Sequence, residues 1–205
     1  MTRCLDSLED CSRRALGAAF AHARALHCAP FAVDCTVGNG YDTLFLAMSV
    51  APEGRVWAFD VQEAGLACAR NRLAEYGAAP CGCSPDDLVS FIHAGHEILA
   101  DRLPPESFGA LWGATFNLGY LPGSDKTVIT RAETTLAALE ALAPRMHCGG
   151  VISVHGYAGH GGGREEVEAV GGWMRNLLWD TWRVAEYAFA NKKHNREVLF
   201  LAERL

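Results

Sequence analysis

The sequence lacks a long uninterrupted hydrophobic run, and its first residues lack the basic segment and apolar core of a secretory leader. No stretch approaches the roughly 18 apolar residues that a membrane-spanning helix needs. We therefore expect a cytoplasmic protein with no membrane partner. Repeats and low-complexity tracts are also missing, so we expect a single domain over residues 1–205 that opens with a helix.

An excess of positive charge is absent as well. The formal net charge of -6 argues against a protein that coats nucleic acid through a uniformly basic surface, because phosphate contacts need clustered lysine and arginine. Two local basic patches remain, one near each end of the chain: Arg13, Arg14 and Arg24, and Lys192, Lys193, His194 and Arg196. For each of these residues taken singly, a solvated surface charge is the simpler interpretation.

The eight cysteines do not have the spacing of a zinc site. The closest pair, Cys81 and Cys83, has one residue between its members, whereas zinc sites usually show two to four residues and a second pair further on. The other cysteines are scattered through expected helices and strands. We expect reduced thiols and no metal.

The hydrophobic pattern alternates between strand-like and helix-like segments. After an opening helix over about residues 7–26, we expect strands at 31–37, 55–61, 88–95, 108–119 and 149–157, and helices at 42–51, 63–77, 96–103, 130–144 and 164–180. The last helix contains Gly171 and Gly172, which should interrupt it. The final strands, 182–190 and 197–205, are too close in sequence for a crossover helix and should pair antiparallel.

This order of elements predicts an α/β fold with a doubly wound, seven-stranded sheet that is mostly parallel and ends in an antiparallel hairpin. That combination resembles the class I methyltransferase (Rossmann-like) fold.

The stretch DCTVGNGYDT, residues 34–43, follows the first expected strand, where open parallel sheets bind their ligands. Gly38 and Gly40 allow a tight turn, but Thr43 stands where the dinucleotide fingerprint has its third glycine. Asp60 ends the second strand at the position from which an acid accepts the hydroxyls of an adenosine ribose. Both NAD and S-adenosylmethionine carry that ribose, so Asp60 does not distinguish them.

Two further features bear on the cofactor. Asp34 ends an apolar strand and needs a cationic or donor partner when buried, which the ammonium group of S-adenosylmethionine would supply. His96 and Glu97 follow the third strand, where an adenine edge would be held. A helix N-terminus with a favourable early acid explains these two residues equally well.

Two segments follow the fourth and fifth strands. In FNLGYLPGSDK, residues 116–126, Asn117 and Tyr120 have a spacing that resembles the N-P-P-Y motif of amino-methyltransferases, although Leu118 and Gly119 replace the prolines. A plain turn is the alternative. In YAGHGGGREE, residues 157–166, His160 can exchange a proton near neutral pH, and a flexible loop with an incidental histidine is the alternative.

Taken together, DCTVGNGYDTLFLA, FDVQ, HEIL, FNLGYLPGSDK, GYAGHGGGREE and NKKHN resemble the rRNA methylase family of class I methyltransferases, from about residue 31 to the end. The resemblance implies S-adenosylmethionine as cofactor. It also implies methylation of the exocyclic amine of 5-aminomethyl-2-thiouridine at the wobble position, so the partner would be a tRNA anticodon arm. The chain departs from the family where NKKHN runs into Arg196 and Glu197 in place of two prolines, and in a longer polar loop at residues 81–87.

The resemblance also implies site residues. On the cofactor side it places Asp34, Thr36, Gly38, Asn39, Gly40, Asp42, Thr43, Asp60, Gln62, His96, Glu97 and Asn117. On the substrate side it places Leu118, Gly119, Tyr120, Leu121, Pro122, Lys126, Tyr157 and His160, with Asp125, Thr134 and Thr135 behind them. Asn117 and Tyr120 would act directly on the substrate, with His160 as the first choice of base and Asp125 as the second.

Other interpretations stay open. The substrate could be another RNA, such as rRNA, or a small-molecule amine, and a cysteine nucleophile could serve a ring-carbon methylation. From other classes, a nicotinamide oxidoreductase and a non-catalytic RNA-binding module remain. A homodimer joining two basic patches would help an acidic chain hold RNA, and Trp173, Trp179 and Trp182 are candidates for its interface or for the core.

Overall fold

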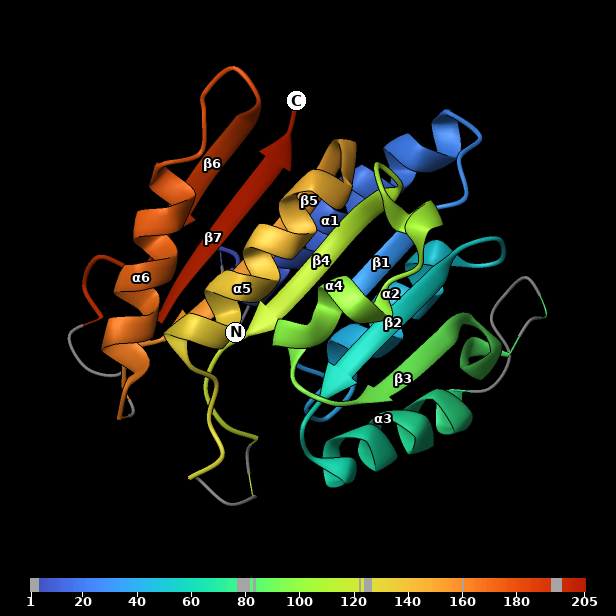
Figure 1. Ribbon diagram of the computed structural model, residues 1–205, viewed down its shortest axis with the longest axis horizontal. Helices are drawn as coiled ribbons and strands as arrows, with labels where there is room; N and C mark the ends of the chain where they lie inside the picture. The colour runs from blue at the N-terminus through green and yellow to red at the C-terminus, as the bar shows by residue number, and fades with distance from the viewer. Residues whose placement is uncertain are drawn as a thin grey trace.

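A seven-stranded sheet forms the centre of the molecule, in the strand order β3-β2-β1-β4-β5-β7-β6 (Figure 1). The computed structural model describes residues 4–76, 82, 84–121, 123, 127–159, 161–192 and 197–205. The strands are β1 (Phe31–Asp34), β2 (Arg55–Asp60), β3 (Val89–His93), β4 (Leu111–Asn117), β5 (Met146–Tyr157), β6 (Trp182–Tyr187) and β7 (Glu197–Arg204). The first five strands run parallel, and β7 pairs antiparallel with both β5 and β6. The predicted fold class is confirmed.

Helices cover both faces of the sheet. They are α1 (Leu8–Ala25), α2 (Tyr41–Val50), α3 (Glu63–Tyr76), α4 (Leu99–Arg102), α5 (Ala132–Leu142) and α6 (Gly163–Arg175), with single 3₁₀ turns at Pro85–Leu88, His96–Ile98, Pro105–Ser107 and Ala143–Arg145. The first three helices pack with one apolar cluster and the last three with another. Neighbouring strand residues alternate between them, as Ala32 and Val33 do, so the central strands are apolar on both faces.

The opening helix α1 crosses the sheet on the face opposite α5 (Figure 1). Ser7 and Asp10 form a capping box at its start, in which the Ser7 Oγ accepts from the Asp10 backbone N–H at 3.0 Å. Phe20 is fully buried against β4, where a Cβ on Gly113 would lie only 2.5 Å from the Phe20 ring. The helix therefore lies across β4 and β5 and brings its first turn close to the carboxyl end of β5.

The predicted interruption of the last helix is wrong. The helix α6 runs unbroken through Gly171 and Gly172. A Cβ on Gly171 would lie 2.9 Å from the Phe200 ring of β7, so this glycine allows close packing between helix and sheet.

Among the tryptophans considered for an interface, Trp182 is buried, whereas Trp179 is largely exposed. No helix in the described part of the chain has the length and apolar character to span a membrane.

Replacing Gly40 and replacing Gly172 by alanine should change the free energy of unfolding in opposite directions. Gly40 has a φ of 76°, and its Cβ would lie 2.4 Å from the Ala69 Cα, so Gly40→Ala should lower the free energy of unfolding by at least about 2 kcal/mol. Gly172 has open space within its helix, so Gly172→Ala should raise it by about 1 kcal/mol. Urea denaturation measures both, and equal effects of the two variants would contradict this account.

Candidate active site

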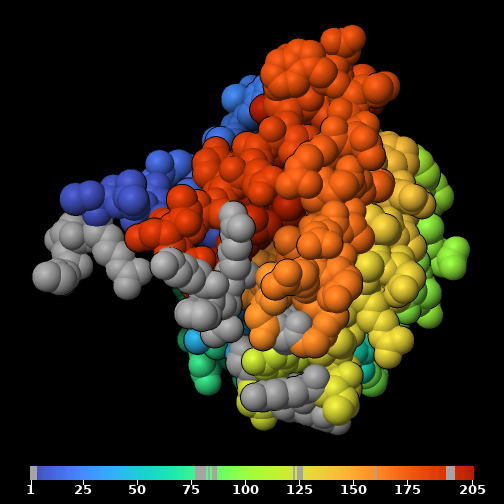
Figure 2. All heavy atoms as spheres, turned by 90° about the vertical axis from the view of Figure 1, so that its left-hand side faces the viewer, coloured from blue at the N-terminus to red at the C-terminus, as the bar shows by residue number. Residues whose placement is uncertain are grey.

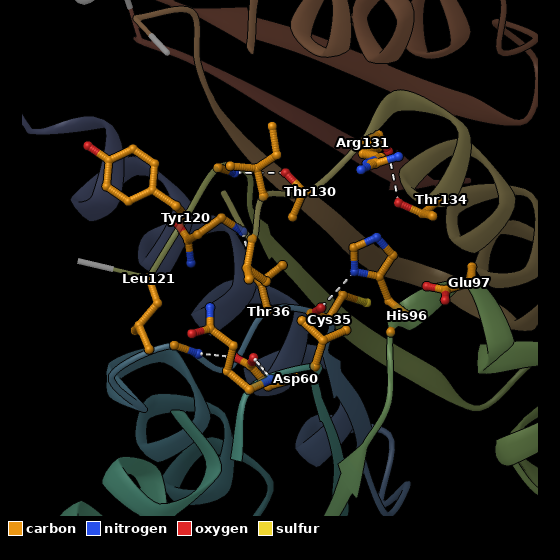
Figure 3. Close-up of a pocket in the computed structure, with 18 of the residues that line it drawn as sticks. Cys35, Thr36, Asp60, His96, Glu97, Tyr120, Leu121, Thr130, Arg131 and Thr134 are labelled. Atoms are coloured by element: carbon orange, nitrogen blue, oxygen red, sulfur yellow. Dashed lines mark hydrogen bonds between the residues drawn. The ribbon is translucent and has the colours of Figure 1, made fainter. Parts of the chain in front are cut away.

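A cavity of about 260 Å³, which we call the main cavity, lies beyond the carboxyl ends of β1 to β4 (Figure 3). Parallel sheets bind ligands at this edge. Its lining is Cys35, Thr36, Gly38, Asp60, Val61, Gln62, Ala94, Gly95, His96, Glu97, Asn117, Gly119, Tyr120, Leu121, Val128, Ile129, Thr130, Arg131 and Thr134. Eleven of the predicted residues therefore meet here: Thr36, Gly38, Asp60, Gln62, His96, Glu97, Asn117, Gly119, Tyr120, Leu121 and Thr134.

Asp60 sets the shape of one side of the main cavity. Its Oδ2 accepts a hydrogen bond from the Gly38 backbone N–H, and its Oδ1 accepts one from the Gln62 backbone N–H, both at 2.8 Å. Gly38 has a φ of 52°, in the left-handed region that favours glycine. Because each carboxylate oxygen has a further lone pair, Asp60 can still accept hydroxyl hydrogens from a ligand.

Asp34 lies behind this wall. The side chain is fully buried, with Oδ1 accepting from the Thr36 backbone N–H at 3.1 Å and Oδ2 accepting from the Thr43 hydroxyl at 2.6 Å. Burial, together with the nearby carboxylate of Asp42, raises the pKa of Asp34 to about 7. Asp34 therefore ties the end of β1 to the first turn of α2.

Four other residues of the turn also lie behind the wall of the main cavity. Asn39, Gly40, Asp42 and Thr43, like Asp34, do not line the main cavity. The carbonyl of Asn39 accepts a hydrogen bond from Arg72 at 2.8 Å, and Gly40 packs against Ala69. A direct contact between these five residues and a cofactor stays a prediction.

His96 lines the cavity with little exposure. Its Nδ1 lies 2.9 Å from the Cys35 carbonyl oxygen, so Nδ1 carries the proton and donates. Burial lowers the pKa of His96, which favours the neutral ring. Next to it, Gly95 leaves room for Glu97, whose Oε2 would lie 2.1 Å from a Cβ at that position.

Glu166 is a residue for which the sequence analysis predicted no role. It is buried, and its carboxylate accepts hydrogen bonds from the Thr135 hydroxyl and the Thr130 hydroxyl, both at 2.7 Å. Thr130 in turn pairs with Gly119, accepting from its N–H at 2.8 Å and donating its own N–H to the Gly119 carbonyl at 2.9 Å. Glu166 thus connects α5 and α6 to the segment that closes the cavity opposite Asp60 (Figure 3).

Asn117 stands at the end of β4 with a fixed orientation. Its backbone N–H donates to the Thr36 hydroxyl at 2.7 Å, and its side-chain Nδ2 donates to the Asp42 Oδ2 at 2.6 Å. Because the amide nitrogen faces Asp42, the amide oxygen Oδ1 is the atom left to accept a hydrogen bond from a ligand.

The remaining residues predicted on the substrate side lie in different parts of the molecule. Leu118 is buried in the core and does not line the main cavity, because side chains alternate along the strand and Asn117 faces the other way. Tyr157 lies at a different hollow, and Thr135 lies behind the lining. Pro122, Asp125, Lys126 and His160 lie outside the described residues, as do Cys81 and Cys83.

Cys35 lines the cavity, but its chemistry does not favour a nucleophile. The side chain is buried, and burial next to Asp34 raises the pKa of the Cys35 thiol well above its ordinary value. The reactive thiolate is therefore scarce at neutral pH.

A family model and a curated relative identify the family of this chain. The family described as "Putative rRNA methylase" matches residues 56–203. A curated relative from Arabidopsis thaliana, named tRNA (mnm(5)s(2)U34)-methyltransferase, chloroplastic, is 32% identical over 177 residues. That match covers 84% of this chain but only 62% of the Arabidopsis protein.

Two solved structures have a similar fold over nearly the whole chain. A putative rRNA methylase from Clostridium thermocellum has a TM-score of 0.78 and 30% identity, covering 93% of this chain and 97% of its own. A putative methyltransferase from Streptococcus mutans in complex with SAH has a TM-score of 0.77 and 28% identity, covering 98% of this chain and 99% of its own.

The raised pKa of Asp34 predicts a pH-dependent stability. Because its folded-state pKa of about 7 exceeds the ordinary 3.8, the folded chain keeps a proton that the unfolded chain releases. The contribution of this group is therefore largest below about pH 4 and is lost as the pH rises through 7. The difference in free energy of unfolding between the native chain and Asp34→Asn should fall by up to about 1.4 kcal/mol per pH unit in that window. Urea titrations from pH 4.5 to 7.5 measure it, and parallel curves would contradict it.

Proposed function

Since the chain belongs to the rRNA methylase family, we propose that it is a methyltransferase that moves the methyl group of S-adenosylmethionine to the amine of 5-aminomethyl-2-thiouridine at the tRNA wobble position. The observation that carries the proposal is the orientation of Asn117, which presents an amide oxygen at the end of β4, on the wall of the main cavity. The name of the Arabidopsis relative supports the choice of nucleoside.

The lining of the main cavity fits S-adenosylmethionine. Asp60 offers carboxylate oxygens to the ribose hydroxyls, and Leu121, Val128 and Ile129 supply apolar surface for the adenine. Asp60 and Glu97 also give the cavity two carboxylates that suit a cationic cofactor. When bound, the cofactor supplies an electrophilic methyl group.

The protein's own contribution is orientation and exclusion of water. Asn117 Oδ1 accepts a hydrogen from the amine, which aims the nitrogen lone pair away from the amide and toward the main cavity. Tyr120, about one-third exposed at the edge of this cavity, offers a ring on which the 2-thiouracil base stacks. No covalent intermediate is needed, in keeping with the buried thiol of Cys35.

Three parts of the wider expectation stay predictions: the anticodon arm as partner, a cytoplasmic location and a homodimer. Leu178 and Trp179, at 72% and 67% exposure, offer an apolar surface next to the edge strand β6 for the homodimer. Trp182, being buried, belongs to the core instead.

The direct test supplies the protein with labelled S-adenosylmethionine and with tRNA whose wobble nucleoside lacks the methyl group. We expect one labelled nucleoside, 5-methylaminomethyl-2-thiouridine, identified by mass spectrometry after digestion. Label in rRNA or in a different nucleoside would replace the proposed substrate while keeping the methyltransferase class. Binding of NADH without binding of S-adenosylmethionine would overturn the class itself.

Asn117→Ala and Asp60→Ala should separate orientation of the amine from cofactor binding. We expect Asn117→Ala to lower the single-turnover rate by roughly 100-fold or more while the Kd for S-adenosylmethionine changes little. Asp60→Ala should weaken cofactor binding by roughly 10-fold or more, because two ribose hydrogen bonds are lost. Calorimetry and rapid quench measure the two effects. If Asn117→Ala weakened cofactor binding as much as it slowed transfer, its role would be structural.

A further inference from the structure

A second cavity, of about 540 Å³, lies between the first turn of α1 and the ends of β5 and β7. Its lining is Cys4, Leu5, Asp6, Ser7, Leu8, Glu9, His155, Tyr157, Phe189 and Glu197. Figure 2 shows blue residues from the start of the chain beside red residues from its C-terminal part. The residues that the resemblance places on the cofactor do not line it.

The described lining of the second cavity is acidic. It contains the carboxylates of Asp6, Glu9 and Glu197 but no lysine or arginine. Arg14, Arg13 and Lys192 pair with these three acids from outside the lining. Tyr157 and Phe189 add aromatic rings, and rings together with carboxylates are the surroundings that an organic cation prefers.

His155 is the buried polar side chain of this cavity. The residue is only 8% exposed, and within the described part of the chain its Nε2 makes no hydrogen bond. Nε2 lies 3.5 Å from the Glu197 Oε2, while Nδ1 lies 3.3 Å from the Tyr157 hydroxyl, whose ring stacks on the imidazole. Burial lowers the pKa of His155, so the ring is neutral at pH 7 and one of its nitrogens has a lone pair that can accept a proton.

His155 is also the neighbour of Asn117. The two residues are register partners on the parallel strands β5 and β4. Both line a small pocket of about 10 Å³, roughly the space of one water molecule, together with Glu9, Ser12, Asp42, Thr115, Phe116 and Ser153. Asn117 shares this pocket with the main cavity, and His155 and Glu9 share it with the second cavity. The small pocket therefore shares a wall with each of the two larger cavities, which have no lining residue in common.

We propose that the second cavity receives the protonated primary amine of the substrate and that His155 Nε2 takes the proton from it. This inference rests on the proposed function and deepens it. A primary amine with a pKa near 10 is almost fully protonated at pH 7, and its nitrogen then has no lone pair for the methyl group.

The proton balance is simple. The N–H bond of the ammonium group breaks, its electron pair stays on nitrogen, and the proton binds His155 Nε2. The neutral amine then uses that pair for the new N–C bond, while the electrons of the broken C–S bond stay on sulfur. Glu197 stabilises the resulting imidazolium ring. The other ionisable groups around the ring are Tyr157 on β5, Glu9 on α1, Asp42 on α2 and Lys192 before β7.

The test compares pH profiles of the single-turnover rate for the native chain, His155→Asn and His160→Ala. For His155→Asn we expect a loss of roughly 100-fold at pH 7 that shrinks to a few-fold near pH 10, where the substrate amine loses its proton without help. A merely structural loss would stay constant with pH. A constant loss for His155→Asn, or a pH-rescued loss for His160→Ala alone, would overturn the proposal.

Glu197→Gln gives a second readout, with Glu203→Gln on the same strand as its matched control. Removing the carboxylate beside Nε2 should move the acid limb of the rate profile to lower pH, because the imidazolium ring loses its anionic neighbour. Glu203, exposed near the other end of β7, should leave the profile unchanged. Identical profiles for the two variants would count against His155 as the base. Binding of S-adenosylhomocysteine by each variant checks that the main cavity is intact.

A binding experiment separates this inference from the proposed function. Ethylammonium chloride is titrated into the protein while the imidazole resonances of His155 are followed by NMR. Saturable shifts that weaken in Glu197→Gln support the second cavity as an amine site even if the tRNA assay fails. If the tRNA assay succeeds and ethylammonium produces no saturable shift, the inference fails alone.

Discussion

The buried carboxylate of Asp34 is the constraint on which the site depends. A carboxyl group taken out of water at the end of β1 is costly unless its oxygens are satisfied, and here a backbone N–H and the Thr43 hydroxyl satisfy them. These two bonds fix where the strand stops and where α2 begins. Gly38 then lies where Asp60 can accept its N–H. One buried acid thereby helps to position the half-buried Asp60, which faces the main cavity.

Asn117 is coupled to the same turn from the other side. Its backbone bonds to Thr36 and its amide bonds to Asp42, so both the position and the rotation of the side chain follow from the turn after β1. The carboxylate of Asp42 also lies 3.5 Å from Arg13 of α1. The opening helix, the glycine turn and the end of β4 therefore form one connected polar unit, and the residues of the main and second cavities are held by shared contacts.

The sequence predicted the sheet well because strands buried on both faces have continuous apolar runs. The position of Asp60 was predictable for a similar reason, since an acid that ends the second strand lies at the edge where parallel sheets bind ligands. Its contact with a ribose stays a prediction. Asp34 was harder, because its partners are a hydroxyl and a backbone N–H in its own turn, and nothing in the residue pattern distinguishes this from contact with a ligand. The sequence did not predict the hydrogen bonds of Glu166, because Thr130 and Thr135 approach it only when α5 and α6 pack together. The position of His155 could be found only from the strand order, because the pairing of β4 with β5 places it beside Asn117.

Electrostatics gives a reason for dividing the site between two cavities. A sulfonium cofactor and a protonated amine repel each other, and at about 4 Å this costs several kcal/mol in surroundings of intermediate dielectric. The proposed amine passes the carboxylates of Glu9 and Glu197, which it shares with Arg13 and Lys192, before it reaches the neutral amide of Asn117. Loss of the proton to His155 at that point removes the repulsion and creates the lone pair in the same event. The acidic balance of the chain, which argued against a basic nucleic-acid surface, fits the proposed substrate group, which is itself a cation.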